Sequence, residues 1–304
     1  MKELFVLSAI VLGFGLVSCD KISNPVIVQT TLDTSLYPGN FAGTYVFPTF
    51  GPNTNTQKNV MLEDFTGHKC TFCPPAATEA ANIEDANAGR VFVVSIHGGA
   101  SNSGITDFQV SFPGTSKYYT DHTTPETREI SSNFFQMGVG FSSNPQGMVN
   151  RITKDGAMFT NAGNWAPWTA EELDAELQVN IQAVANYYPS TGGVFIHTET
   201  EFMEDIDGEY NIVIYAIENK RIDWQLDGGV DIENYEHHNV LIGCVFGEAF
   251  GRLVTSGSIQ AGTKIEQEFT YEVPDGLTND DMHFIVFVYD KATFEVMQAI
   301  KLEF

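Results

Sequence analysis

The feature that most constrains this fold is a pair of cysteines, Cys70 and Cys73, within the stretch "HKCTFCPP". A strand-like run, "KNVMLEDFTG", precedes the pair. The Ala-rich stretch "AATEAANIEDAN" that follows it is typical of a helix that stops near Gly89. The next run, "VFVVSIH" at 91–97, is typical of a strand buried on both faces of a parallel sheet. The pattern therefore predicts a β-turn-α-β unit with both cysteines at its first strand-to-helix junction.

Two cysteines three positions apart can bring their sulfurs to bonding distance with little backbone movement. One thiolate can then attack a disulfide, and the other can resolve the mixed disulfide. We expect Cys70 to be the exposed attacker and Cys73 to be the resolving thiol. His68 and Lys69 lie beside Cys70 and would favour its thiolate. Because two prolines follow Cys73, the regular helix is expected to start at about Pro74, beyond the first cysteine.

Two other interpretations of the cysteine pair stay open. The pair can be a stable structural disulfide, or it can bind a metal ion together with histidines. The available histidines are His68, His97, His237 and His238. The sequence has no second Cys-x-x-Cys, and no histidine spacing is diagnostic, so we expect neither a metal site nor a cofactor. A buried structural role for His97, a loop position for His237-His238 and a small buried side chain at Cys244 are the default expectations.

The N-terminus has the pattern of a secretory signal. The apolar run from Leu4 to Leu16 is too short to span a bilayer comfortably and has the length of a signal-peptide core. It ends in "LVSC", which resembles a bacterial lipobox, so we expect a signal peptide at 1–18 and acylation of Cys19. An ordinary signal peptide cut nearby is the alternative. Residues 19–57 would form a lipidated N-terminus, a tether and the first short strands, in an oxidising compartment.

The net negative charge of the chain limits the classes of partner that it can bind. Among the 304 residues, 15 are Lys or Arg and 39 are Asp or Glu. Nucleic-acid affinity comes mainly from basic side chains that neutralise phosphates, so a nucleic-acid partner is not expected. The acidic surplus also disfavours electrostatic docking on anionic lipid. The lipid on Cys19 is therefore the expected contact with a membrane.

The segment after the first parallel pair of strands is irregular before it becomes helical. Residues 98–125 are rich in Gly, Ser, Thr and aromatics with little periodicity, which is typical of a functional cover or of a mobile insertion. Its aromatic residues at 108–119 could form a cover or partner surface over the cysteine pair, or they could serve ordinary packing of a long insertion. The Thr-Pro dipeptide at 124–125 predicts a helix start. Thr169 and Glu172 predict a capping box that opens a further helix, which extends to Tyr188 along an apolar stripe.

Beyond residue 190 only strand patterns remain, separated by turn signals such as Asp-Gly and Pro-Asp-Gly. This change of pattern predicts two domains. We expect an α/β domain at 58–190, with the insertion at about 98–125, followed by an antiparallel β-sandwich at 191–304.

The stretch "VMLEDFTGHKCTFCP" resembles the active-site strand and turn of the thioredoxins. Thioredoxins carry an acidic residue six positions before the first cysteine, and Asp64 occupies that position. The resemblance implies that Asp64 is a buried proton acceptor for the resolving thiol. It also implies a cis-proline before a later strand, packed against the disulfide, and Pro145 in "SNPQGMVNR" matches it. This sequence departs from the family in having Lys69 where tryptophan is usual, and in a longer segment between Cys73 and Pro145.

Nearly the whole chain resembles the Omp28-related outer-membrane lipoproteins of Bacteroidota. The resemblance rests on the lipobox, "LEDFTGHKCTFCP", "SIHGG", a proline strand that ends in Asn150-Arg151, and an all-β C-terminal half with "YEHHNVLI" and "FIVFVYD". It implies a lipoprotein of the outer membrane in the cell envelope. Whether the protein faces the periplasm or the cell surface stays open.

Two functions are consistent with these features. The first is a lipid-anchored thiol–disulfide oxidoreductase that acts on protein thiols or disulfides, with its catalytic residues at Cys70, Cys73, Asp64, Pro145 and His68. The second is a non-catalytic binding lipoprotein with an unknown envelope or surface partner, in which the Cys70–Cys73 disulfide is structural. Fold alone does not choose between them, because thioredoxin-like domains also serve as scaffolds.

Overall fold

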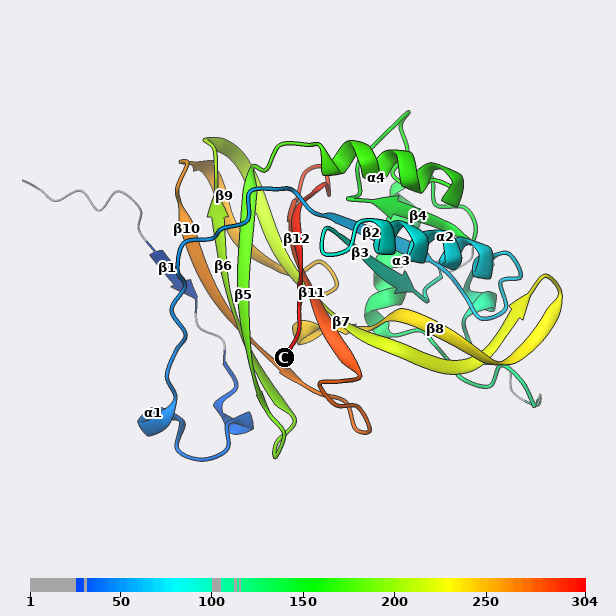
Figure 1. Cartoon of the computed structure of the whole chain (residues 1–304), viewed down its shortest axis with the longest axis horizontal. Coiled ribbons are helices and arrows are strands. Elements are labelled where there is room, and N and C mark those ends of the chain that lie inside the picture. The colour runs from blue at the N-terminus through cyan, green and yellow to red at the C-terminus, as the bar shows by residue number, and fades with distance from the viewer. Residues whose placement is uncertain (1–25, 30–31, 100–104, 112–113, 115) are drawn as a thin grey trace, which may run out of the picture.

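The computed structural model describes residues 26–29, 32–99, 105–111, 114 and 116–304 (Figure 1). The expected signal peptide at 1–18 and the lipidated Cys19 lie outside these residues. Within the described part the fold is mixed α/β, and sheets predominate. The helices are α1 (Phe41–Thr44), α2 (Cys73–Ala86), α3 (Pro125–Met137) and α4 (Trp165–Leu173). The strands are β1 (Val26–Gln29), β2 (Val60–Phe65), β3 (Val91–Ile96), β4 (Gln146–Val149), β5 (Val179–Tyr188), β6 (Gly193–Phe202), β7 (Ile206–Asp227), β8 (Val230–Cys244), β9 (Arg252–Ile259), β10 (Lys264–Glu272), β11 (Met282–Asp290) and β12 (Val296–Leu302).

These strands form two sheets. The first sheet has the order β1-β10-β6-β5. The second has the order β12-β11-β7-β8-β3-β2-β4, with β9 paired to β7 outside this order. The parallel strands β2 and β3, joined by α2, are the predicted β-turn-α-β unit. Because β3 also pairs with β8, at Ser95 and Val240, this unit and the long C-terminal strands belong to one sheet.

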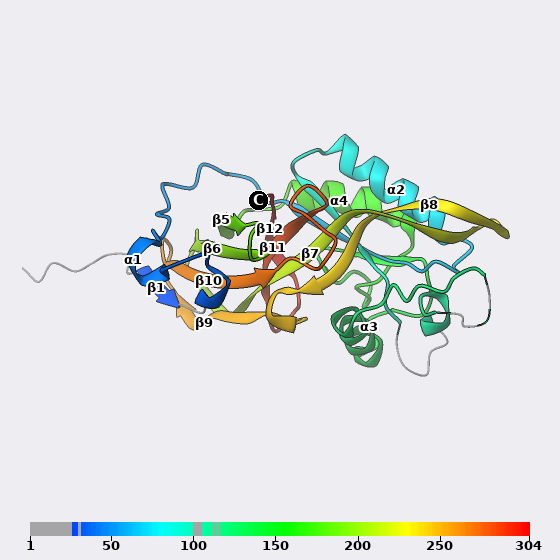
Figure 2. The same cartoon turned by 90° about the horizontal axis from the view of Figure 1, so that it is seen from below.

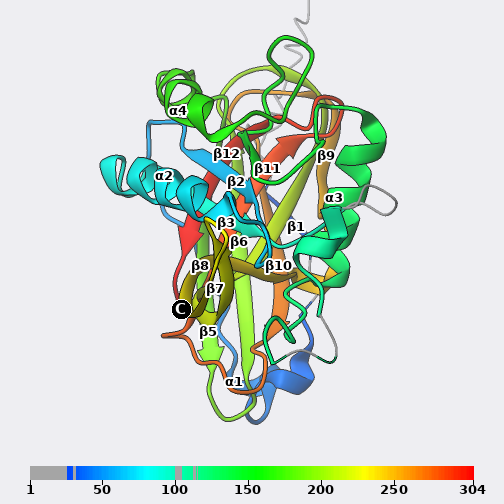
Figure 3. The ribbon, with the colours of Figure 1, turned by 90° about the vertical axis from the view of Figure 1, so that its right-hand side faces the viewer.

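Helices cover both faces of the second sheet at its β3-β2-β4 end, with α2 and α4 on one face and α3 on the other (Figures 2 and 3). Ala80 of α2 shares a buried cluster with Leu62 of β2. Phe134 of α3 shares a different cluster with Phe65 of the same strand. Successive residues of β2 thus face opposite helical layers, which explains why every residue of this strand is buried.

The other end of the second sheet packs on the first sheet. Even-numbered residues of β11 belong to the core between the two sheets, and odd-numbered ones belong to the core under α3. The even set is Met282, Phe284, Val286 and Val288, and the odd set is Ile285, Phe287 and Tyr289. The apolar run "HFIVFVYD" is therefore buried on both faces, although its strand pairs are antiparallel.

The predicted start of α3 is confirmed. The Thr124 side chain accepts a hydrogen bond from the Thr127 backbone N–H at 3.2 Å, and Pro125 lies in the first turn. Ile130 and Phe134 are fully buried on one face, as predicted, whereas Met137 is exposed. α2 starts at Cys73, one residue from the predicted position.

The predicted helix at 169–188 was wrong at both ends. It starts at Trp165, so Thr169 lies inside α4 and does not cap it, and the helix ends at Leu173. Residues from Val179 onward form β5, which pairs along its whole length with β6. Val179 and Ile181 face the core between the sheets with the spacing of a strand. The next residues of β5 that face this core are Ala183 and Ala185. Because their side chains are small, the alternation of apolar and polar residues that indicates a strand is weak in this part of the sequence. Pairing with β6 satisfies the backbone of this segment and decides its structure.

The loop expected around His237 and His238 was also wrong, because both residues lie within β8 and pair with β7. The β7–β8 hairpin is longer than predicted, and it reaches from the two-sheet end of the molecule to the helical end (Figure 1). The division of the chain into domains at residue 190 stays a prediction. The strands on either side of that position, β5 and β6, pair with each other.

A buried ion pair ties the layers together. Arg151, which follows β4, donates two hydrogen bonds of 2.8 Å to the carboxylate oxygens of Glu63 on β2, and both side chains are fully buried. The same guanidinium donates to the hydroxyl of Tyr215 on β7 at 2.8 Å and lies 5.0 Å from the ring centre of Phe287 on β11. Burial alone would lower the pKa of Arg151, but the Glu63 carboxylate raises it above the usual range. The Arg151 guanidinium therefore stays charged.

Removing one partner leaves the other charge buried and unpaired, so Arg151→Met should lower the free energy of unfolding by about 3–5 kcal/mol. Urea unfolding measures this loss. The double variant Glu63→Met with Arg151→Met should recover a large part of it, because no unpaired charge remains. Lys220→Met, in an exposed pair with Glu236, is the matched control and should cost far less. Equal losses for Arg151→Met and Lys220→Met would contradict this role.

Candidate functional site

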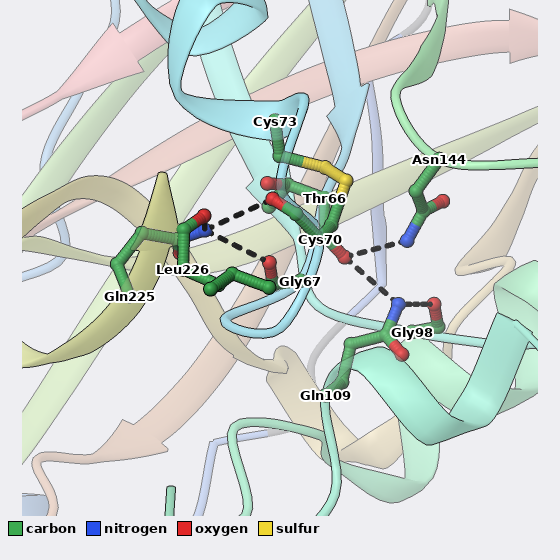
Figure 4. Close-up of a disulfide and its surroundings, with 9 residues drawn as sticks. All are labelled: Thr66, Gly67, Cys70, Cys73, Gly98, Gln109, Asn144, Gln225 and Leu226. Atoms are coloured by element: carbon green, nitrogen blue, oxygen red, sulfur yellow. Dashed lines mark hydrogen bonds between the residues drawn. A yellow bond between two sulfur atoms is a disulfide. The ribbon is translucent and has the colours of Figure 1, made fainter. Parts of the chain in front are cut away.

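Cys70 and Cys73 form a disulfide at the junction between β2 and α2, with their Cα atoms 5.4 Å apart (Figure 4). Cys73 is the first residue of α2, and Pro74 and Pro75 occupy the first turn, where a missing backbone N–H costs no helical hydrogen bond. Cys70 therefore precedes the helix, as the prolines predicted. Its carbonyl accepts from the Cys73 N–H at 3.2 Å, which closes the turn between the two cysteines.

The expectation that Cys70 is exposed was wrong. Cys70 is 3% exposed and Cys73 is 1% exposed, so neither side chain presents a surface to solvent. The residue that does protrude from the turn is Phe72, at 71% exposure. A partner that approaches this turn meets the Phe72 ring before it meets sulfur.

The tip of the β7–β8 hairpin covers the turn that holds the disulfide (Figure 4). The Gln225 side-chain amide donates to the carbonyls of Cys70 at 3.1 Å and Gly67 at 3.3 Å. The Leu226 N–H donates to the His68 carbonyl at 2.8 Å. These contacts join residues more than 150 positions apart, and they satisfy backbone acceptors that a bound peptide could otherwise use.

The hairpin reaches the disulfide turn because its own turn is tight. Gly228 and Gly229 both have positive φ, as a two-residue turn between antiparallel strands requires. Their N–H groups donate to Thr71, at its carbonyl from Gly228 (3.1 Å) and at its hydroxyl from Gly229 (2.8 Å). A bulkier residue at either position would strain the turn that makes these contacts.

The insertion contributes a second part of the cover, which is one of the two roles that its sequence left open. The Phe108 carbonyl accepts from the Lys69 N–H at 2.9 Å, and the Lys69 ammonium lies 5.4 Å from the centre of the Tyr118 ring. Gly67 has no room for a side chain, because a Cβ there would lie 2.7 Å from the Phe108 carbonyl oxygen. Part of the insertion lies outside the described residues.

Asp64 lies behind the disulfide on β2. It is 1% exposed, and neither of its carboxylate oxygens has a hydrogen-bond partner within the described part of the chain. Asp64 and Cys73 line the same cavity of about 230 Å³, together with His97 and Tyr235. Burial raises the pKa of Asp64 to about 7. A carboxyl group with this pKa can both accept and release a proton near neutral pH.

Pro145 immediately precedes β4, which pairs with β2 so that Gln146 lies opposite Phe65. The Asn144–Pro145 peptide bond is cis. The Asn144 side-chain amide donates to the Thr66 carbonyl at 2.9 Å (Figure 4). This bond places the proline segment beside the end of β2, a few residues before Cys70.

His68 is fully buried, and its Nε2 lies 3.1 Å from the Val110 carbonyl oxygen. Burial, followed by the nearby His122, lowers the pKa of His68 to about 4. His68 is thus neutral at pH 7 and adds no positive charge beside Cys70. His97 is buried as expected, and Cys244 is a buried free thiol under α3.

Sequence reasoning missed the hairpin tip and His122. No local motif marks Gln225 or Leu226, because their role depends on the length of β7 and β8 rather than on neighbouring residues. The Asp-Gly-Gly stretch at 227–229 was the one signal that could have indicated a tight hairpin turn.

Fold and site together define a sheet-rich α/β protein with a covered disulfide at a strand-to-helix junction. Residues 133–303 match the family described as outer membrane protein Omp28. Because the match covers more than half of the 304 residues, the chain belongs to the Omp28 family, and the expected location at the outer membrane is confirmed. The match starts beyond Cys73 and does not include the disulfide. None of the helices within the described residues is long and apolar enough to cross a bilayer.

Several solved structures are similar to this chain. HBP35 of Porphyromonas gingivalis is 17% identical, with a TM-score of 0.60 over 83% of this chain and 76% of that one. A protein of Agrobacterium tumefaciens is 14% identical, with a TM-score of 0.49 over 80% and 93% of the two chains. A domain of the outer membrane lipoprotein Omp28 from Porphyromonas gingivalis is 21% identical, with a TM-score of 0.29 over 41% and 87%. At these identities the likeness to HBP35 shows a shared fold alone. No curated protein matches the chain.

The buried carboxyl of Asp64 predicts a pH-dependent cost. Because its folded-state pKa of about 7 exceeds the unfolded value, the folded protein holds a proton that the unfolded chain has released, so stability falls as pH rises from about 4 to 7. Asp64→Asn removes this cost. At pH 8 the free energy of unfolding of this variant should exceed that of the wild type by on the order of 4 kcal/mol, so the variant should unfold at a higher urea concentration. At about pH 4 the two proteins should unfold at nearly the same urea concentration.

Urea unfolding of both proteins across this pH range measures the difference. Glu233→Gln, an exposed carboxylate on the same hairpin that covers the disulfide, is the control. A difference between Asp64→Asn and wild type that stays constant with pH would contradict the assignment.

Proposed function

We propose that this protein is a lipid-anchored thiol–disulfide exchange protein of the outer membrane, acting through Cys70 and Cys73. In this proposal a thioredoxin-like unit is followed by a β-sandwich, and Cys19 carries the anchor. The observation that carries the proposal is the shared cavity behind the disulfide, where the unpaired Asp64 carboxyl lies with Cys73. An unpaired buried carboxyl is costly for a structural role alone.

The exchange has two steps. In the reduced protein, the Cys70 thiolate attacks a partner disulfide, which forms a mixed disulfide and releases one partner thiolate. The Cys73 thiol then gives its proton to Asp64 and attacks Cys70. The Cys70–Cys73 bond forms, the second partner thiolate leaves, and two electrons have moved to the partner. The reverse sequence oxidises a partner dithiol.

Access to Cys70 requires the hairpin tip to move. The contacts of the tip with the disulfide turn are hydrogen bonds from Gln225, Leu226 and the two turn glycines, and the tip itself is exposed at Gly228 and Gly229. Contacts of this kind open at a free-energy cost below that of global unfolding. The hairpin would therefore limit exchange to partners that displace it.

A second candidate function is a binding protein in which the disulfide is structural. The observation that favours it is the burial of both cysteines under the hairpin, because a stable disulfide needs no access. In that case the partner would be an envelope or surface protein, and the cysteines would serve only folding.

Trapping of a mixed disulfide separates the two candidates. We expect the full chain with Cys73→Ser, incubated with oxidised glutathione, to gain a glutathionyl group at Cys70 roughly tenfold faster than the chain with Cys70→Ser gains one at Cys73. Mass spectrometry of the intact chain and of its peptides follows the reaction. The double variant Cys70→Ser with Cys73→Ser measures the background from Cys19 and Cys244. If Cys73→Ser gains glutathione no faster than the double variant does, exchange through Cys70 is contradicted.

A further inference from the structure

The cavity behind the disulfide is larger than the transfer of a proton between Asp64 and Cys73 requires. Its volume is about 230 Å³. An apolar cavity of about 150 Å³ is enough to hold one benzene molecule, so this cavity has room for a single ring that carries a substituent. No step of thiol exchange accounts for this space.

The cavity opens to the surface between α2 and β8. Among the residues that line it, Thr78 and Ala81 on α2 and Glu236 and His238 on β8 are exposed. A ligand therefore enters between these two elements, and not through the contacts that hold the hairpin tip on the disulfide turn.

Two buried side chains that line the cavity lack hydrogen-bond partners within the described part of the chain. Neither carboxylate oxygen of Asp64 has a partner, and neither ring nitrogen of His97 has one. His97 belongs to a histidine cluster with His122 and His237, in which the ring centres lie between 5.0 and 5.5 Å apart. Buried polar atoms without partners are rare in native proteins, and each calls for an explanation such as a bound molecule.

Asp64 and His97 are neighbours on one side of the sheet. Asp64 lies opposite Ser95 in the pairing of β2 with β3, and His97 follows Ser95 by two residues. A carboxyl group keeps an acceptor oxygen whether or not it is ionised, and an imidazole keeps an N–H donor whether or not it is charged. One hydroxyl group can donate to the first and accept from the second. A group that only donates or only accepts would leave one of the two without a partner.

The wall of the cavity on the side of α2 is apolar and has small side chains. Pro74, Ala77, Ala80 and Ala81 line it, and their spacings of three and four residues place them on one side of the helix. Because alanine side chains are short, an apolar ring can lie against this side of the helix and be removed from water there.

We propose that the cavity behind the disulfide binds a phenol-type ring, with the hydroxyl between Asp64 and His97 and the ring against the alanines of α2. A free small phenol and the tyrosine side chain of a partner protein present the same chemistry to this site. Binding breaks no bond and needs no reduced cysteine, so it goes beyond thiol exchange and does not depend on it.

The test uses the full chain with the disulfide intact and the probe 4-methylphenol, which has the ring and the hydroxyl of a tyrosine side chain. Titration followed by NMR of the probe should show saturable binding at one site per chain. The affinity should be roughly tenfold higher than for toluene, which has the same ring without the hydroxyl.

Two leucine variants of α2 test the location. Ala77→Leu places a larger side chain in the cavity and should weaken the binding of 4-methylphenol by roughly tenfold or more. Ala86→Leu, on the same helix but outside this cavity, is the matched control and should bind as the wild type does.

Asp64→Ala removes the acceptor without filling the cavity. It should lower the affinity for 4-methylphenol to about the affinity for toluene, and it should leave toluene binding in place. Should Ala77→Leu fail to fold, the comparison of Asp64→Ala with Ala86→Leu decides the question.

A blocked tripeptide with a central tyrosine distinguishes the two sources of the ring. Competition of this peptide with 4-methylphenol assigns the site to a partner's tyrosine, and binding of 4-methylphenol alone assigns it to a free phenol. The proposal is overturned if the wild type shows no saturable binding of 4-methylphenol, if toluene binds equally well, or if Asp64→Ala and Ala86→Leu bind 4-methylphenol with equal affinity. None of these results bears on thiol exchange, which the glutathione reaction at Cys70 measures separately.

Discussion

The buried pair of Glu63 and Arg151 is the interaction on which the arrangement of this molecule depends. It joins β2, the segment after β4, and β7 through the Tyr215 hydroxyl, and its guanidinium also lies against the ring of Phe134 on α3, 5.2 Å from the ring centre. Its charges are compensated only when these elements are all in place, so it specifies one packing of the helical layer on the long strands. The neighbouring residue on the opposite face of β2 is Asp64, which faces the disulfide cavity. The strand β2 thus carries both Glu63, which belongs to the buried ion pair, and Asp64, whose carboxyl group lies behind the disulfide.

The long β7–β8 hairpin links the two ends of the molecule in a second way. It extends the C-terminal strands past β3, covers the disulfide turn with backbone and amide hydrogen bonds, and brings His237 and Asp223 to the buried histidines. Access of solvent and of a partner to the site would both depend on this one element. Its exposed tip, with two turn glycines, is the part of the site that a partner can reach without breaking the core.

Local chemistry made part of this structure predictable. The continuous apolar run at 91–97, the double proline after Cys73 and the Thr-Pro start at 124–125 each gave one dominant signal, and the elements formed accordingly. The segment at 179–188 showed an apolar stripe of helical spacing and only a weak strand period, and its pairing with β6 overrode that signal. The hairpin contacts and the histidine cluster could not be predicted, because they join residues such as Gln225 and Cys70 that only the folded topology brings together.

In the function proposed above, the Cys70–Cys73 disulfide is exchangeable and protected by the hairpin, rather than permanently structural. The most direct measurement is the reduction potential of this disulfide in the full chain, from equilibration with thiol–disulfide buffers and quantification of the two cysteines by mass spectrometry. An exchange site should have a potential above about −300 mV, within the range of thiol–disulfide oxidoreductases. A potential below about −300 mV would contradict the account and assign the bond to a structural role.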